Sequence, residues 1–178
     1  EYYGVVPDLA AVCKGIASGY PISVLCGRAD MMDLAGPQAG TASVRMTGTF
    51  SGNSIVCAAA LATLSELRKP GTYEQLFATG QALMRGLGEA LERTGIPHRI
   101  TGEPPAFQPW FSPEVVGNFR QARAADPALD ARFGALLVDH GVLKAHEKFF
   151  ISTAHGEADT RQTLEGFGAV ADLLAQVG

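Results

Sequence analysis

The 178-residue chain lacks the residue clusters typical of nucleic-acid-binding and membrane proteins. Its 14 Lys and Arg residues are outnumbered by 18 Asp and Glu residues, and no stretch concentrates the basic ones, which argues against a nucleic-acid partner. Every apolar stretch is broken well before the roughly 18 residues that a membrane-spanning helix needs. The sequence therefore predicts a soluble, cytoplasmic protein that binds neither nucleic acid nor membrane.

Cysteine and histidine are also sparse, and their spacing does not predict a metal site. The three cysteines lie far apart and lack the CxxC spacing of zinc sites and redox pairs, so we expect reduced thiols in a core at Cys13, Cys26 and Cys57. The four histidines show no HExxH or paired helical spacing. We therefore expect no bound metal.

Hydrophobic residues make up 47% of the chain, which is enough for a buried core. Apolar runs and Gly or Pro breaks divide the first part into a short helix or buried strand at 9–14, a buried strand at 22–27 and an amphipathic turn or short helix at 28–34. The Ala- and Leu-rich segment 54–68 predicts a helix that is buried on most of its circumference.

The second part of the chain changes character, since strands now alternate with amphipathic helices. The expected helices are 72–94, 129–140 and 157–177. The expected strands are 98–101, 107–111, 142–144 and 149–152. This order predicts a small α+β domain.

Lys14 stands at the end of an apolar run and directly before a glycine-rich turn. A lone lysine in such a place is usually a surface residue whose aliphatic part packs on apolar neighbours. Burial, however, disfavours a charged ammonium, and a neutral amine is what Schiff-base chemistry requires. The position therefore permits a catalytic role without requiring one.

The segment TGTFSGN at 47–53 is rich in hydroxyls and glycines and runs directly into the expected helix. Glycines let backbone amides approach an anion, hydroxyls donate to its oxygens, and a helix start favours negative charge, so this loop can bind phosphate. The same residues also suit a helix cap, in which Ser51 or Asn53 accepts from the amides of the first turn. A Walker A loop is excluded, because no Gly-Lys-Ser/Thr closes the segment.

Five short motifs follow one another in order over residues 5 to 65. They are Pro7-Asp8-Leu9, Cys13-Lys14-Gly15, Gly19-Tyr20-Pro21, Gly27-Arg28 and Gly48-Thr49-Phe50-Ser51-Gly52-Asn53. Their order and spacing resemble the class III aminotransferases, a family of fold type I enzymes that use pyridoxal 5'-phosphate (PLP). The resemblance is strongest to the branch of glutamate-1-semialdehyde aminomutases and β-amino-acid aminotransferases, and it covers only the family's C-terminal part.

The resemblance implies an α/β fold with two parts. Residues 1–70 would be the C-terminal part of the PLP-binding large domain, and residues 71–178 would be a linking helix and a small α+β C-terminal domain. Lys14 would carry PLP as a Schiff base and act as the catalytic acid and base, while Gly48 and Thr49 would bind the phosphate. In this family that phosphate usually belongs to the neighbouring subunit, which implies a homodimer with a shared active site.

The implied reaction is amino transfer between a small amino acid or amine and an oxo-acid acceptor. Three alternatives stay open: a glutamate-1-semialdehyde-type 2,1-aminomutase, another PLP reaction such as racemisation or decarboxylation, and a non-catalytic fragment that needs its N-terminal half. The chain has no initiator Met, and the family's ring-pairing Asp, stacking aromatic residue and other phosphate loop lie outside it, so we expect a piece of a longer polypeptide. Asp8 is expected to cap a helix and not to replace that Asp.

Overall fold

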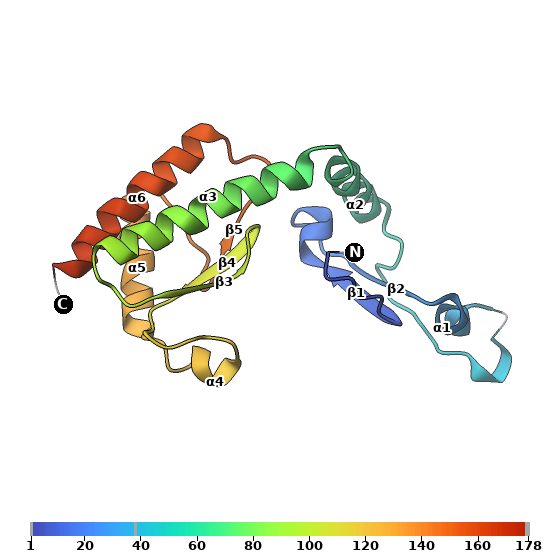
Figure 1. The fold of residues 1–178 in the computed structure, drawn as a ribbon. Helices are drawn as coiled ribbons and strands as arrows, with labels where there is room; N and C mark the ends of the chain where they lie inside the picture. Colours follow the sequence, from blue (N-terminus) through green and yellow to red (C-terminus); the bar gives the residue numbers. More distant parts are fainter. Residues whose placement is uncertain (1, 38, 177–178) are drawn as a thin grey trace. The chain divides into compact units, whose positions relative to one another are not determined.

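The computed structural model describes residues 2–37 and 39–176. The chain divides into two compact units, Glu1–Pro70 and Gly71–Gly178, which we call the first and the second unit (Figure 1). Gly71, at the boundary, adopts a φ of 86°, a backbone conformation that favours glycine. The assignment of these units to a large and a small domain of an enzyme stays a prediction.

The first unit consists of an antiparallel hairpin, several short helical turns and one longer helix. The hairpin pairs β1 (Leu9–Cys13) with β2 (Ser23–Gly27), from Leu9 opposite Gly27 to Cys13 opposite Ser23. The helical elements are η1 (Lys14–Ala17) between the strands, then α1 (Ala29–Met32), η2 (Asp33–Ala35), η3 (Gly40–Ala42) and α2 (Ser54–Leu67). The segment 9–14 was expected to form a short helix or a strand, and β1 shows that it forms a strand. Strand β2 and helix α2 lie where the sequence predicts them.

Arg28 closes the open end of this hairpin. Its backbone N–H donates to the Asp8 carbonyl at 2.9 Å, and its Nη1 donates to Asp8 Oδ1, also at 2.9 Å. The carboxylates of Asp30 and Asp8 raise the pKa of the Arg28 guanidinium above its ordinary value. Asp8 therefore precedes a strand and pairs with Arg28, so the expectation that it caps a helix is wrong.

The first unit buries little of its apolar surface. Among its described residues only Ala17 of η1 and Ala60 of α2 are buried, at 0% and 7% exposure. On α2, Ile55 and Leu61 are 68% and 66% exposed. The expectation of a helix buried on most of its circumference is wrong for this chain, because the packing partner that this unit offers to α2 is the small turn η1. The strands β1 and β2, expected to be buried, are likewise mostly exposed.

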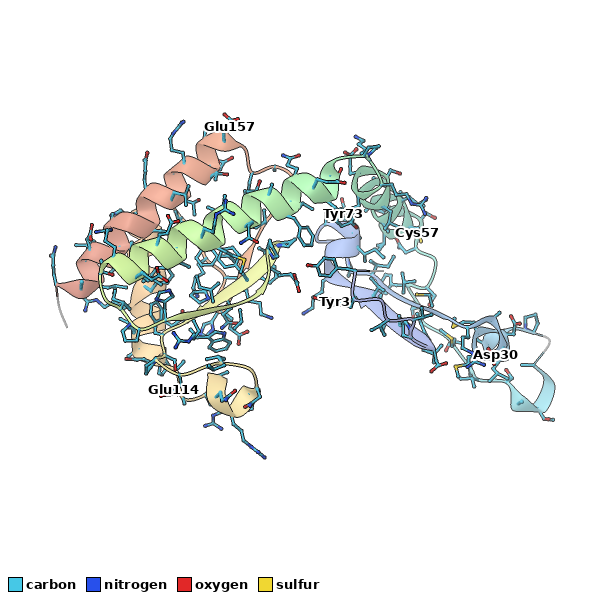
Figure 2. The ribbon with its side chains drawn as sticks, viewed as in Figure 1. Tyr3, Asp30, Cys57, Tyr73, Glu114 and Glu157 are labelled. Carbon is cyan, nitrogen blue, oxygen red and sulfur yellow. The ribbon has the colours of Figure 1, made fainter. Side chains whose placement is uncertain are left out.

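The three cysteines all lie in this unit, and all are free thiols. Cys13 and Cys26 are exposed on the hairpin strands, and Cys57 on α2 is partly buried (Figure 2). The prediction of unpaired cysteines is confirmed, and the prediction that they lie in a core is wrong, because neither strand is covered.

The second unit packs helices against a three-stranded antiparallel sheet. The sheet has the order β3 (Arg99–Glu103), β4 (Ala106–Trp110), β5 (Phe149–Phe150). The helices are α3 (Thr72–Arg93), α4 (Phe119–Ala122), α5 (Pro127–Asp139) and α6 (Glu157–Ala175). Helices α3 and α6 lie side by side, and α3 also contacts β3 and β4 (Figure 1). Among the described residues, no helix is both long and apolar enough to cross a membrane.

The expected strand at 142–144 is not formed, and the expected strand at 149–152 is shortened to β5. Lys144 explains the first difference, since its Nζ donates to the Ala145 and His146 carbonyls at 3.3 and 2.9 Å and lies 3.2 Å from Asp130 Oδ1. These contacts curl the segment around a buried ammonium and prevent pairing with a strand. The short helix α4 was not predicted. Helix α6 ends at Ala175, and residue 177, where the expected helix ends, lies outside the described residues.

The core of the second unit is built around aromatic rings. Phe133 of α5 is fully buried, with its ring 5.4 Å from that of Phe111 and 6.5 Å from that of Phe167. Phe107 and Phe149, on paired strands, stack at 5.0 Å. Each fully buried side chain of this size contributes about 1.5 to 3 kcal/mol, and a well-oriented ring pair adds about 0.5 to 1.5 kcal/mol. The apolar stripes of α3 and α6, which include Leu87, Leu91 and Val170, complete this core.

Candidate cofactor site

Lys14 lies where β1 ends and η1 begins, and its backbone is unusual. Its φ is 56°, and that of Ser18 at the other end of the turn is 45°. Such left-handed conformations are uncommon in residues that carry a Cβ, and they occur often at functional sites. The Lys14 residue is exposed within this unit, although the apolar run before it permitted a buried position.

Lys14 lines an open hollow of about 480 Å³ between the end of β1 and the start of β2. The other lining residues are Cys13, Gly19, Tyr20, Pro21 and Ile22. No described residue forms a hydrogen bond or ion pair with Lys14 Nζ. The amine is therefore available to a ligand in this hollow.

The predicted phosphate loop lines a second hollow, of about 680 Å³. Its lining includes Gly48 and Thr49 with the rest of the loop to Asn53, and also Pro21 and Ile22. Since Pro21 and Ile22 also line the hollow at Lys14, the two hollows are neighbours. The structure thus places Lys14 at one hollow and Gly48 and Thr49 at the other, the three residues that the sequence predicts as the site.

The loop is held by its own hydrogen bonds and by a helix cap. The Ser51 N–H donates to the Gly48 carbonyl at 3.0 Å, and Asn53 Oδ1 accepts from the N–H groups of Ile55 and Val56 at 3.1 and 3.2 Å. Asn53 is therefore the cap of α2, one of the two residues expected for it. Because the Asn53 side chain accepts from the Ile55 and Val56 amides, these are not free for an anion. The donors left in the loop are its hydroxyls and those backbone amides, such as that of Thr49, that form no hydrogen bond within it.

These residues fit PLP by their chemistry. A Cβ on Gly48 would lie 3.0 Å from Ser51 Oγ, so the absence of a side chain keeps the loop tight and its backbone open to a ligand. No described residue hydrogen-bonds to the Thr49 hydroxyl, and Thr49 lines the hollow, so this hydroxyl can donate to a phosphate bound there. The first turn of the 14-residue helix α2 favours negative charge nearby. Lys14 would supply the primary amine with which the aldehyde of PLP reacts.

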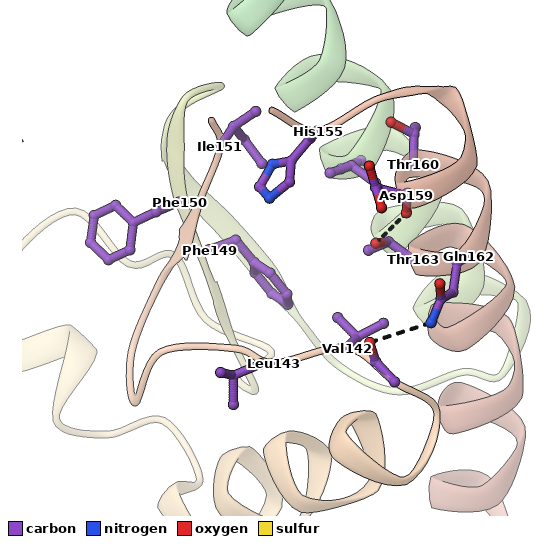
Figure 3. Close-up of a pocket in the computed structure, with 12 residues that line it drawn as sticks. Val142, Leu143, Phe149, Phe150, Ile151, His155, Asp159, Thr160, Gln162 and Thr163 are labelled. Atoms are coloured by element: carbon purple, nitrogen blue, oxygen red, sulfur yellow. Dashed lines mark hydrogen bonds between the residues drawn. The ribbon is translucent and has the colours of Figure 1, made fainter. Parts of the chain in front are cut away.

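A further hollow, of about 270 Å³, lies in the second unit between the loop after α5, strand β5 and the start of α6 (Figure 3). Its polar groups are already bound locally: His155 Nδ1 accepts from the Ser152 N–H at 3.1 Å, and Thr163 Oγ1 donates to the Asp159 carbonyl at 2.7 Å. Gln162 Nε2 donates to the Gly141 carbonyl at 3.4 Å. The sequence did not single out this hollow, and its satisfied polar groups support a structural role.

Residues 1–147 match the family model described as aminotransferase class-III. The chain belongs to this family. Over 96% of its length it is similar to an omega-transaminase from Sphaerobacter thermophilus, at 26% identity and a TM-score of 0.89. It is also similar to a β-phenylalanine aminotransferase from Variovorax paradoxus, over 94% of its length at 26% identity and a TM-score of 0.81.

A third solved structure is the PLP internal aldimine form of the FumI protein from Sphingopyxis sp. MTA144, similar over 98% of this chain at 28% identity and a TM-score of 0.80. The chain spans 40% of the length of the Sphaerobacter protein and 39% of each of the other two. These likenesses confirm the predicted mixed α/β fold, which is that of part of the fold type I transaminases.

Proposed function

We propose that this chain supplies Lys14 and the loop of Gly48 and Thr49 to the active site of a PLP-dependent aminotransferase. The observation that carries the proposal is that Lys14 and Thr49 each line a hollow of the first unit and that no described residue forms a hydrogen bond or ion pair with either side chain. The reaction would move an amino group between a small amino acid or amine and an oxo-acid acceptor.

Lys14 is the best placed of the four lysines. Lys69 Nζ lies 2.6 Å from Glu66 Oε2, and Lys144 pairs with Asp130 and has a side chain that is only 2% exposed. Both of these amines are therefore engaged in ion pairs. Lys148 lies in the second unit, outside the residues that line either hollow of the proposed site.

PLP, when bound, supplies an aldehyde carbon that reacts with primary amines and a ring that takes up electrons from the substrate. Lys14 Nζ is the amine to which that aldehyde would be joined. Once a substrate amine has displaced it, the same Nζ can accept a proton from the substrate carbon that bears the amino group and later return one as an acid. Thr49 Oγ1 and the backbone at Gly48 hold and orient the phosphate.

The finer parts of the proposal follow from the family resemblance. The protein would act as a homodimer, with the Gly48–Thr49 loop serving the cofactor of the neighbouring subunit. The branch of glutamate-1-semialdehyde aminomutases and β-amino-acid aminotransferases supplies the substrates to assay first. β-Phenylalanine, the substrate in the name of the Variovorax relative, is one such donor.

The decisive experiment is borohydride reduction of the purified protein after incubation with PLP. Peptide mass spectrometry is expected to find the reduced cofactor on Lys14, and Lys14→Ala to abolish both the label and amino transfer. Lys69→Ala is the matched control, because it removes a surface lysine that lines neither hollow, and it should change neither the label nor amino transfer. A label on another lysine in the unaltered protein would refute the assignment of Lys14.

The products separate the two reaction types that share this lysine. Amino transfer from β-phenylalanine or another donor requires an oxo-acid acceptor and yields a carbonyl product. A rearranged amino compound formed from glutamate-1-semialdehyde without any acceptor would identify an aminomutase instead.

A further inference from the structure

A fourth hollow, of about 530 Å³, lies in the second unit between the last turns of α3 and the start of β3. Its lining includes Gly88 and the polar side chains of Glu92, His98 and Arg99. Arg99 is engaged, because its guanidinium donates to the carbonyls of His98 and Pro113. No described residue forms a hydrogen bond or ion pair with the Glu92 carboxylate. The hollow therefore offers a ligand one imidazole and one unpaired carboxylate.

The ring of His98 is held with one nitrogen open to a ligand. Its Nδ1 lies 2.9 Å from the Ile96 carbonyl oxygen, and because a carbonyl only accepts, Nδ1 carries the proton in this bond. The neutral ring then has a lone pair on Nε2, to which no described residue donates. Histidines that bind metals almost always fix their ring in this way, with the other nitrogen donating to a carbonyl, a carboxylate or water.

Gly88 lies next to this lone pair, although the packing of α3 does not require a glycine there. A Cβ on Gly88 would lie 3.8 Å from Ile100 Cδ1 and 3.9 Å from His98 Nε2, and both are ordinary van der Waals distances. Its φ is not left-handed, and glycine inside a helix is destabilising relative to alanine. An alanine methyl group would fit, but it would stand against Nε2. Glycine at this position keeps that nitrogen accessible.

Glu92 lies one helical turn after Gly88, on the same face of α3. Residues at i and i+4 of a helix have their Cβ atoms about 5 to 6 Å apart, and long side chains lean towards the preceding turn. The Glu92 carboxylate can therefore reach over Gly88, where His98 Nε2 lies. The structure records no ion pair between these two groups, so both keep their ligand positions.

We propose that His98 Nε2 and the Glu92 carboxylate bind a divalent transition-metal ion over Gly88. Imidazole nitrogen and carboxylate oxygen are ligands that zinc takes at about 2.0 to 2.2 Å, and imidazole also suits nickel and copper. No group of three or more His, Cys, Asp and Glu side chains in the described part of the chain is placed to hold a metal, so water completes the coordination. The ion would join the end of α3 to the start of β3.

The test titrates the protein with Ni²⁺ in a calorimeter at neutral pH. Ni²⁺ is the probe because thiolates favour zinc, and the chain has three free cysteines. His98→Ala and Glu92→Gln are each expected to weaken Ni²⁺ binding at least about tenfold, since even the loss of a residue that only orients a ligand costs that much. Both variants should also lose the rise in melting temperature that Ni²⁺ gives the unaltered protein.

Gly88→Ala separates metal binding from a purely structural role of this turn. Without metal its melting temperature is expected to rise, because alanine favours the helix and its Cβ meets no close contact. Its affinity for Ni²⁺ is expected to fall, by a smaller factor than in His98→Ala. The matched controls are Glu89→Gln, on a different face of α3, and His146→Ala, an exposed histidine outside the hollow; both should bind Ni²⁺ as the unaltered protein does.

The inference is overturned if the unaltered protein gives no heat of binding up to millimolar Ni²⁺. It is equally overturned if His98→Ala and Glu92→Gln bind the ion as tightly as the unaltered protein, because the ion then lies on other side chains. Glu92→Gln alone decides the question if His98→Ala does not fold. None of these results depends on PLP, so the proposed function is tested separately by the labelling of Lys14.

Discussion

Gly80 in α3 offers a sharp test of how closely the helix packs on the sheet of the second unit. A Cβ at this position would lie 2.0 Å from the carbonyl oxygen and 2.4 Å from the carbonyl carbon of Pro104, in the turn between β3 and β4. Both are backbone atoms, which cannot rotate away as the end of a side chain can. Helix and turn would have to separate by about 1 Å to bring the contact to 3.0 Å.

Gly80→Ala therefore sets two effects against each other. Replacing a helical glycine by alanine gains about 0.5 to 1 kcal/mol through the lower entropy of the unfolded chain. Forcing a methyl group into a space that is already filled costs about 1 to 3 kcal/mol. The cost at Gly80 is expected in the upper part of that range, because the atoms in the way belong to the Pro104 backbone. The free energy of unfolding is expected to fall by about 1 to 2 kcal/mol.

Gly134 in α5 is the matched control, because nothing lies within 4 Å of where its Cβ would be. Gly134→Ala is expected to raise the free energy of unfolding by about 0.5 to 1 kcal/mol. Urea denaturation followed by far-ultraviolet circular dichroism measures both variants. A Gly80→Ala protein that is as stable as Gly134→Ala would refute the close approach of α3 to the turn at Pro104.

Three further substitutions probe single contacts. Thr49→Ala is expected to weaken PLP binding about 10- to 150-fold in an absorbance titration, since a hydrogen bond to a charged group contributes about 1.5 to 3 kcal/mol, whereas Thr47→Ala, outside the hollow, leaves it unchanged. Asn53→Ala removes the cap of α2 and is expected to cost about 1 kcal/mol in urea denaturation; an unchanged midpoint would contradict the cap. Asp130→Asn removes the negative charge that pairs with the buried Lys144 ammonium. Because the Asp130 side chain is 26% exposed, the free energy of unfolding is expected to fall by about 1 to 3 kcal/mol. Unchanged stability in urea would show that the Ala145 and His146 carbonyls alone stabilise the ammonium.

The long helices of both units could be predicted because their signals are local. Apolar spacing and the Lys69-Pro70-Gly71 and Gly95-Ile96-Pro97 breaks located α2 and α3 to within one or two residues. The segment 142–144 shows where this approach fails. It has the composition of a strand, but Lys144 forms an ion pair with Asp130, 14 residues earlier, and a periodic pattern contains no information about that contact.

The candidate site shows the same division between local and distant information. The order of short motifs predicts Lys14, Gly48 and Thr49 as site residues, and their role stays a prediction. Capping rules left Ser51 and Asn53 as candidates for the cap of α2, and the structure shows Asn53. The role of Asp8 was predicted wrongly because its carboxylate forms an ion pair with Arg28, 20 residues later. The hydrogen bond between Ser18 Oγ and Thr63 Oγ1, 45 residues apart, depends on how the turn η1 packs on α2, which no spacing in the sequence reveals.

The single tryptophan gives the protein a built-in optical probe of one of its two units. Trp110 lies on β4, and its indole Nε1 donates to Thr101 Oγ1 on β3 at 2.8 Å, so its fluorescence depends on the pairing of these strands. Emission excited in the tryptophan band therefore reports on the second unit alone. Visible absorbance from PLP joined to Lys14 would report on the first. Recorded together during one denaturation, the two signals would show whether the units unfold in one transition or in two.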